Sequence, residues 1–196
     1  MFTGIIRHRG TVVSLVRWPR ARLIVRIPRL RARRSDSVAV DGVCLTVASH
    51  VRATYHFDLL GETLRVTTLG QRRPGDRVNI EPSLRAGDRV GGHLVLGHID
   101  GVGRVVRRRA TARGLALTVA VPAALRRFLV PKGAVALDGI SLTVAPGSMK
   151  ATCTVLVIPH TAAVTTLGTR QVGEALNLEV DPLARYAVAA IDAVRP

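Results

Sequence analysis

The 196-residue chain contains one sequence pattern twice, in the same order. Four pairs of segments carry the repeat: 38–48 with 135–145, 63–70 with 161–168, 75–81 with 173–179, and 4–10 with 97–103. The repeat covers about half of the chain, which is too long for a solenoid unit and suits a small domain built twice. Two similar domains offer two similar pockets. The pattern therefore favours a function that uses two copies of one ligand.

The repeat sets the expected domain organisation. We place a first barrel at residues 1–88, a second at 89–184 and a short C-terminal helix at 185–196. Each barrel is near the lower size limit for an independent hydrophobic core. Packing between the domains, or between subunits, is therefore expected to add stability.

The local patterns are typical of β-structure, because short runs of Val, Ile, Leu and Thr alternate with Gly, Pro and Asp. Strands are expected in the first half at 10–15, 23–27, 37–40, 44–48, 54–59 and 77–80. Strands are expected in the second half at 103–106, 115–119, 134–137, 141–145, 152–158 and 175–178. Six strands per half predict closed barrels, since closure removes exposed edges. The predicted fold is all-β, with two tandem six-stranded closed barrels of Greek-key type and a short C-terminal helix.

Two Asp-Gly pairs, at 41–42 and 138–139, predict tight hairpin turns. The strands after these turns begin with short polar side chains that face one side: Cys44 and Thr46, and Ser141 and Thr143. Short helices are expected at 62–67, 123–128 and 161–164. A last helix is expected at 182–194, because Asp181-Pro182 is a favourable helix start.

The composition points to a cytoplasmic protein with a basic surface. The net charge is +16, and all but two of the 29 basic residues are arginine. The six aromatic residues are scattered, so no base-stacking platform is indicated and nucleic acid is expected to bind only non-specifically. Apolar stretches such as 115–125 are too short to span a membrane, and the N-terminus has no charged leader. Two cysteines at non-equivalent positions indicate no disulfide framework.

Five motifs together resemble the riboflavin synthase α-chain family over essentially the whole chain. These motifs lie at 1–6, 41–47, 91–101, 138–144 and 177–181. The resemblance implies a dismutation in which one 6,7-dimethyl-8-ribityllumazine donates a four-carbon unit to another. The products are riboflavin and 5-amino-6-ribitylaminouracil. It also implies a homotrimer, in which the first barrel of one subunit pairs with the second barrel of its neighbour. No metal or redox cofactor is expected.

The chemistry of that reaction suggests roles for particular side chains. The C7 methyl group of the lumazine is acidic, so a base of modest strength suffices, and His98 suits proton transfer near neutral pH. Cys44, Ser141 and Thr143 are expected to orient the pteridine or an adding nucleophile. Asp181 is expected to align Ser141 or to transfer a proton. These five residues are the predicted catalytic group.

Two pockets are expected, one per repeat. The first is expected between 4–6, 44–46 and 58–63, and the second between 97–99, 141–143 and 156–161. The predicted substrate-binding residues of the first half are Phe2, Gly4, Ile5, Ile6, Leu45, Thr46, Asp58, Glu62 and Thr63. Those of the second half are Gly97, Ile99, Lys132, Leu142, Leu156, Ile158 and Thr161. Lys132 is expected to hold a carbonyl or ribityl oxygen.

Several alternatives stay open at this point. Cys44 is either a pocket residue, a covalent nucleophile or a buried small hydrophobe. His93 either belongs to the site or only orders the connection between the barrels. The family's scaffold also occurs in lumazine- and flavin-binding antenna proteins that do no chemistry, and a paralogue could join other pteridines. Retention of Cys44, His98, Ser141, Thr143 and Asp181 together favours the enzyme.

Overall fold

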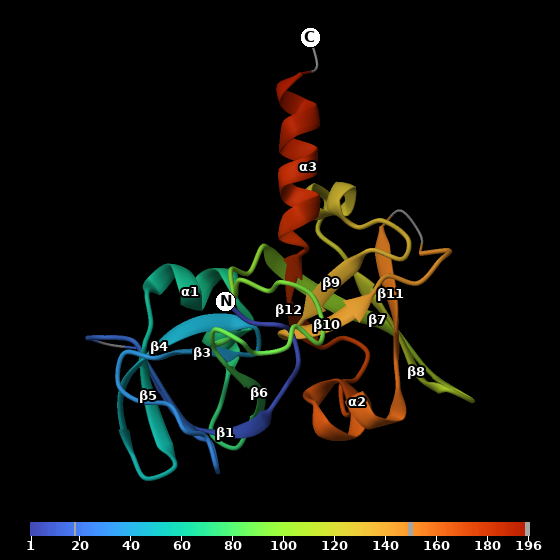
Figure 1. Ribbon diagram of the computed structural model, residues 1–196. Helices are drawn as coiled ribbons and strands as arrows, with labels where there is room; N and C mark the ends of the chain where they lie inside the picture. Colours follow the sequence, from blue (N-terminus) through green and yellow to red (C-terminus); the bar gives the residue numbers. More distant parts are fainter. Residues whose placement is uncertain (18, 149–150, 195–196) are drawn as a thin grey trace.

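The computed structural model describes residues 1–17, 19–148 and 151–194 (Figure 1). The first half forms a closed barrel with the strand order β1-β2-β5-β4-β3-β6. Its strands are β1 (His8–Val16), β2 (Arg22–Arg26), β3 (Ser37–Val40), β4 (Val43–Val51), β5 (Thr54–Asp58) and β6 (Arg77–Pro82). Each predicted strand of this half is confirmed, and the closed barrel is confirmed with them.

The second half repeats the strand order, but its six strands form a sheet that no continuous ladder closes, so the closed barrel predicted for this half is not confirmed. Its strands are β7 (Gly101–Thr111), β8 (Gly114–Ala120), β9 (Ala134–Leu137), β10 (Ile140–Thr143), β11 (Thr152–Val157) and β12 (Ala175–Val180). The order is β10-β9-β12-β7-β8-β11, and the end strands meet through an isolated bridge between Val144 and Val155. Pro146 stands at the position of Ser49, which pairs with His56 in the first barrel. Proline has no N–H to donate, so the ladder stops early on this side.

The two Asp-Gly turns form as predicted and pack against each other. The φ angles are 46° and 81° at Asp41 and Gly42, and 45° and 76° at Asp138 and Gly139. Positive φ at both central residues is the geometry that Asp-Gly favours in a two-residue hairpin. A Cβ atom on Gly42 would come within 2.6 Å of the Gly139 nitrogen. The glycines therefore allow the two turns, and with them the two repeats, to approach closely.

Two buried asparagines exchange hydrogen bonds across this contact. The Asn79 side chain donates to the Asp138 carbonyl at 3.0 Å and accepts from the Thr166 N–H at 2.9 Å. The Asn177 side chain donates to the Asp41 carbonyl at 2.8 Å, and it also accepts from a backbone N–H of the first repeat. Both asparagines are fully buried, so these bonds satisfy groups that would otherwise be costly to bury. The two repeats are thus joined by a matched pair of polar contacts.

The segment that precedes each barrel crosses to the other barrel. The Ser141 N–H donates to the Gly4 carbonyl at 2.8 Å, and the Cys44 N–H donates to the Gly97 carbonyl at 2.9 Å. Phe2 and Val95 pair with each other between the two crossings. The expected pocket frames were therefore wrong in one respect. Residues 4–6 lie beside the second sheet, and residues 97–99 lie beside the first barrel.

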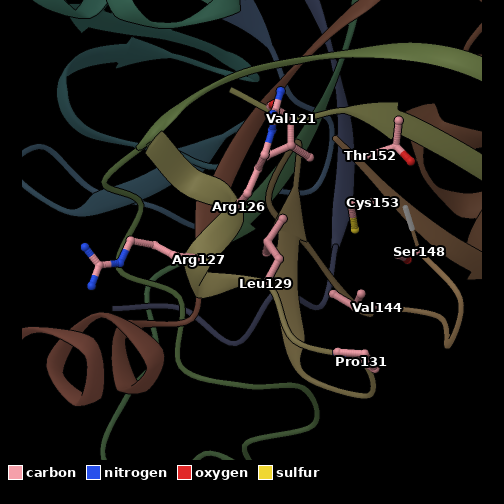
Figure 2. Close-up of a pocket in the computed structure, with 9 residues that line it drawn as sticks. All are labelled: Val121, Arg126, Arg127, Leu129, Pro131, Val144, Ser148, Thr152 and Cys153. Atoms are coloured by element: carbon pink, nitrogen blue, oxygen red, sulfur yellow. The ribbon is translucent and has the colours of Figure 1, made fainter. Parts of the chain in front are cut away.

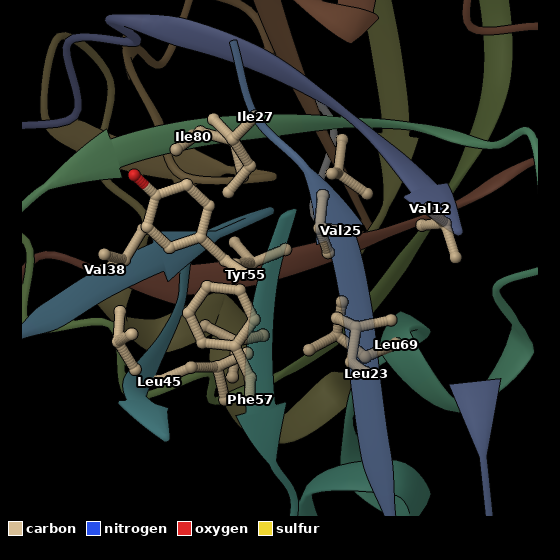
Figure 3. Packing of buried hydrophobic residues seen from close by; sticks show 14 of the residues in the cluster. Val12, Leu23, Val25, Ile27, Val38, Leu45, Tyr55, Phe57, Leu69 and Ile80 are labelled. Carbon is tan, nitrogen blue, oxygen red and sulfur yellow. The ribbon is translucent and has the colours of Figure 1, made fainter. Parts of the chain in front are cut away.

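The interior of the first barrel is filled by apolar side chains from all around its wall (Figure 3). Tyr55 and Phe57 are the largest of them and are 2 % and 0 % exposed. The Tyr55 hydroxyl donates to the Leu30 carbonyl at 2.7 Å, which satisfies its polar end. A second cluster of similar extent fills the second sheet. Ile99 packs against the first cluster and Ile6 against the second, in line with the crossing of the two segments.

Short helices lie between the strands, and one longer helix follows them. They are α1 (Gly61–Val66), η1 (Thr68–Gln71), η2 (Ala123–Phe128), α2 (Pro159–Val164), η3 (Thr166–Gly168) and α3 (Pro182–Ala193). The segment predicted at 123–128 is a 3-10 helix. Asp181 caps α3 as predicted, because its carboxylate accepts from the Leu183 N–H at 2.9 Å. The last two residues of the helix expected at 185–196 lie outside the described residues.

Helix α3 projects away from both repeats (Figure 1). Several of its apolar side chains are exposed. Leu183, Tyr186 and Ile191 are 67 %, 71 % and 50 % exposed. Within the described part of the chain, no helix is long and apolar enough to cross a membrane.

Candidate functional site

The second repeat brings its predicted pocket residues together around one cavity. The cavity has a volume of about 320 Å³ and lies between β10, the start of the following loop, β11 and α2. The predicted residues that line it are Ser141, Leu142, Thr143, Leu156, Ile158 and Thr161. Leu156 and Ile158 are 62 % and 58 % exposed, so this wall offers an open apolar surface to a ring. Apolar walls with a few hydroxyl groups suit a flat heteroaromatic ligand.

The equivalent cavity of the first repeat is more polar. It has a volume of about 390 Å³, and Thr46 and Asp58 line it as predicted. Arg22, Arg34 and Ser35 line it as well, and sequence reasoning missed them. The Asp58 carboxylate forms an ion pair of 2.6 Å with the Arg22 guanidinium. Because Asp58 stands where the second repeat has Leu156, one pocket has a charged wall and the other an apolar one.

Three predicted residues lie near these cavities without lining them. Glu62 and Thr63 lie on α1, where Glu62 is exposed and the Thr63 carbonyl accepts from the Thr67 hydroxyl at 2.6 Å. Lys132 lies in the turn before β9 with φ of 67°, and its N–H donates to the Val144 carbonyl at 2.8 Å. Ser35 is the matching residue of the first repeat and also has a positive φ, of 73°. The repeat alignment could have indicated Ser35 and its neighbour Arg34.

His98 lies at the first barrel, next to Cys44. Gly97 has φ of 81°, and a Cβ atom there would come within 2.6 Å of the Cys44 Cβ. His98 follows directly and is exposed, while Cys44 is half-buried on β4. Leu45 is buried in the barrel core, so its side chain faces away from this surface. The structure therefore places an imidazole and a thiol at the same barrel, with Thr46 two residues after Cys44 on the same strand.

Glu179 holds the segment that carries His98. Its carboxylate accepts from the Leu96 N–H at 2.7 Å and from the Gly97 N–H at 3.0 Å. Burial raises the pKa of Glu179 to about 7, and the two backbone donors oppose that shift. Sequence reasoning singled out the surrounding motif but not this residue. Its signal was the match between Glu179 and Glu81 in the repeat.

Glu81 performs the same task for the N-terminal segment. Its carboxylate accepts from the Thr3 and Gly4 N–H groups at 2.8 and 2.9 Å. Burial raises the pKa of Glu81 as well. The segment places Ile5, which is 38 % exposed, next to the second sheet, while Phe2 is fully buried between the repeats. Ile5 thus occupies, at the second repeat, the position that His98 occupies at the first.

Ser141 has a different partner from the one expected. Its hydroxyl lies 2.7 Å from Nδ1 of His93, and the other ring nitrogen of His93 is buried without a hydrogen-bond partner among the described residues. Burial lowers the pKa of His93, and the negative charge of Asp181 opposes that shift. Asp181 itself caps α3. The structure thus places the Ser141 hydroxyl against His93, with Asp181 close enough for its charge to act on the imidazole.

The open question about His93 is answered by its geometry. His93 contacts Ser141 directly, so it belongs to the surroundings of the second pocket. Gly92 makes this approach possible, because a Cβ atom there would come within 2.7 Å of the Ser141 Cβ. The pair of glycines before His93 was the available sequence signal.

Comparison with known proteins gives a consistent result. The model of the lumazine binding domain matches the chain twice, at residues 3–83 and 96–181. A riboflavin synthase of Mycobacterium tuberculosis is 42% identical over 194 residues, covering 95% of this chain and 96% of the relative. The riboflavin synthase of Bacillus subtilis is 33% identical over 189 residues, covering 95% and 87%.

A solved structure confirms the fold. The crystal structure of LumP complexed with riboflavin superimposes with a TM-score of 0.83 and 21% identity, covering 92% of this chain and 99% of LumP. The sequence matches extend over both repeats and over almost the whole length of the relatives. The chain therefore carries two lumazine binding domains and belongs to the riboflavin synthase family.

Proposed function

We propose that the protein is a riboflavin synthase. It converts two molecules of 6,7-dimethyl-8-ribityllumazine into riboflavin and 5-amino-6-ribitylaminouracil, by transfer of a four-carbon unit. The observation that carries the proposal is the pair of cavities at equivalent places in two lumazine binding domains. A reaction between two copies of one substrate needs two such pockets with unequal chemical groups. Relatives that are riboflavin synthases support the same activity.

The two pockets carry different polar groups, as is needed when one lumazine donates the four-carbon unit and the other accepts it. His98 lies beside Cys44 at the first barrel and accepts or returns the proton of a C7 methyl group. At the second repeat Ser141, held by His93, and Thr143 orient the other pteridine, and Asp181 keeps a negative charge near the imidazole. Most of the rate enhancement then comes from holding the two rings in contact.

A shared site and a homotrimer are part of this proposal. The exposed apolar side chains of α3 provide a surface that a neighbouring subunit can cover. The first pocket of one subunit then faces the second pocket of its neighbour. The remaining features are minor: two free cysteines suit a cytoplasmic location, and the exposed arginines of β7 account for non-specific binding of polyanions at low salt.

One experiment tests the activity directly. Purified protein is incubated with 6,7-dimethyl-8-ribityllumazine, and the growth of flavin absorbance is recorded against time. The proposal predicts one riboflavin formed for every two lumazines consumed. Stable binding of lumazine without turnover would instead identify a carrier or antenna protein.

A further inference from the structure

The second repeat contains a cavity that the proposed reaction does not use. It has a volume of about 520 Å³, larger than the volume of either lumazine pocket. Its apolar walls are formed by Val121, Leu129, Pro131, Val144 and Cys153 (Figure 2). Of these residues only Val144 also lines the lumazine cavity of the same repeat. A volume in this range with mostly apolar walls is typical of a small-molecule site.

The comparison of the two repeats explains why the space exists. Cys153 pairs with Val119, and at the same register position of the first barrel Tyr55 pairs with Val25. The buried ring of Tyr55 fills the end of the first barrel (Figure 3). Cysteine ends at its sulfur atom, so the second repeat lacks the volume of that ring. The seam of the second sheet is also weaker here, because its strands meet through the isolated bridge at Val144.

The segment that covers this end of each repeat also leaves more space in the second repeat than in the first. In the first barrel the residues after Ile27 are tied down by the hydrogen bond from the Tyr55 hydroxyl to the Leu30 carbonyl. In the second repeat the corresponding segment is longer and forms η2. The space left by Cys153 is therefore covered by the segment that contains η2, and no side chain of the described residues fills it.

Two arginines and two hydroxyl groups supply the polar part of the cavity, from Arg126, Arg127, Ser148 and Thr152. The Arg126 Nε donates to the Val121 carbonyl at 3.1 Å, which fixes this side chain at the cavity. The terminal amino groups of Arg126 form no hydrogen bond or ion pair within the described residues. Arg127 points away (Figure 2) and is bound to the Asp192 carboxylate at 2.6 and 2.7 Å. The Ser148 hydroxyl donates to the Ala145 carbonyl at 2.9 Å. Among the described residues, the free donors at the cavity thus belong to Arg126 and to the Thr152 hydroxyl.

We propose that this cavity binds a small apolar molecule that carries a carboxylate, such as a medium-chain fatty acid. The apolar tail lies against Leu129, Val144 and Cys153, and the carboxylate is bound by the Arg126 guanidinium. Arginine is well suited to this task, because its parallel N–H donors match the two oxygens of a carboxylate. Since Val144 lines both cavities, a bound molecule also contacts the wall of the lumazine pocket.

Calorimetric titration of the full chain with octanoate tests the proposal. We expect one octanoate per chain in this cavity. Cys153→Tyr introduces the ring that the first repeat has at this position, and it is expected to weaken octanoate binding at least tenfold. The matched control Cys153→Ala keeps the cavity open and is expected to leave the affinity for octanoate within about threefold. Arg126→Gln is expected to weaken octanoate binding about tenfold, because it removes a charge-assisted contact, and to leave binding of neutral octanol unchanged.

A second measurement does not depend on the folding of a variant. Octanoate is expected to slow the modification of Cys153 by N-ethylmaleimide at least fivefold and to leave modification of Cys44 unchanged, as followed by peptide mass spectrometry. Equal octanoate affinity in wild type and Cys153→Tyr would overturn the proposal, since the molecule would then occupy another pocket. The absence of octanoate binding, or of any protection at Cys153, would overturn it as well.

Discussion

The two repeats share one strand order and differ in what they place around their pockets. The first pocket has a charged wall with the Arg22–Asp58 ion pair, and the segment that carries His98 comes to the first barrel from the other repeat. The second pocket has an apolar wall at Leu156 and a buried hydrogen bond between Ser141 and His93. A duplicated fold therefore keeps the binding geometry while the two copies acquire different chemistry. This is what a reaction between two identical substrates requires, since one molecule must donate and the other accept.

The largest expected effect is a loss of kcat when the histidine beside the first barrel is replaced. His98→Gln is expected to lower kcat by about 10²-fold or more, the usual scale for loss of a general acid or base, with ligand affinity changed by only a few-fold. Cys44→Ser is expected to cost much less, because the second repeat already has serine at that position. His50→Gln, an exposed histidine on β4, is the matched control. Steady-state kinetics with the lumazine measures all three, and a greater loss in Cys44→Ser than in His98→Gln would contradict the assignment.

The second pocket is tested through the Ser141–His93 hydrogen bond. Ser141→Ala and His93→Gln are each expected to lower kcat by about tenfold, and the double variant is expected to be no worse than the more severe single one. Coupled losses indicate that His93 acts through Ser141. If the loss of kcat in the double variant equals the product of the two single losses, His93 acts independently of Ser141.

Helix α3 follows the second repeat and has no counterpart in the first. Tyr186→Asp with Ile191→Asp places two charges on its exposed apolar side, and subunits are expected to dissociate before the barrels unfold. Sedimentation velocity should show a smaller species, while thermal unfolding of the barrels stays nearly unchanged. A wild-type protein that is fully active as a monomer would contradict the shared site.

The buried carboxylates provide a pH test. Burial raises the pKa of Glu179 to about 7 from an ordinary value of 4.5, so folding favours the protonated form. Its contribution to stability is therefore fully present below pH 4.5 and is lost as the pH rises toward 7. Glu179→Gln is expected to flatten the fall in the free energy of unfolding between these pH values, as measured by urea denaturation. Asp41, whose pKa burial raises to about 6, contributes to the remaining slope in both proteins. An unchanged slope would show that folding does not raise the pKa of Glu179.

The smallest effect concerns the charged wall. Asp58→Leu gives the first pocket the side-chain type of the second and removes an ion pair between partly exposed groups. Such a pair contributes about 1 kcal/mol or less, so stability is expected to change little while affinity at the first pocket changes a few-fold. Calorimetry with riboflavin measures both sites, and a large loss of stability would contradict this account.

The sequence predicted the fold well because its signals are local. The Asp-Gly turns, the spacing of the strands and the Asp181 cap each follow from the conformational preferences of a few neighbouring residues. The pairing of the pockets could not be predicted in this way. Whether residues 97–99 lie against Cys44 or Ser141 depends on contacts between distant segments, and either partner satisfies the same local pattern.

The same reason explains which site residues were missed. Glu179 is one of several acidic residues in the sequence, and only the fold shows that its carboxylate holds the segment before His98. His93 was identified as a candidate, but its contact with Ser141 arises from the crossing of the chain at Gly92. The cavity at Cys153 likewise becomes visible only when its register is compared with that of Tyr55.

The central claim is that one chain holds two unequal pockets for the same ligand, and ligand stoichiometry tests it most directly. Riboflavin is titrated calorimetrically into the wild type, Asp58→Leu and Leu156→Asp. We predict two molecules per chain in the wild type, with Asp58→Leu altering the affinity of one site and Leu156→Asp that of the other. Saturation at one molecule per chain, or both variants altering the same binding step, would contradict the claim.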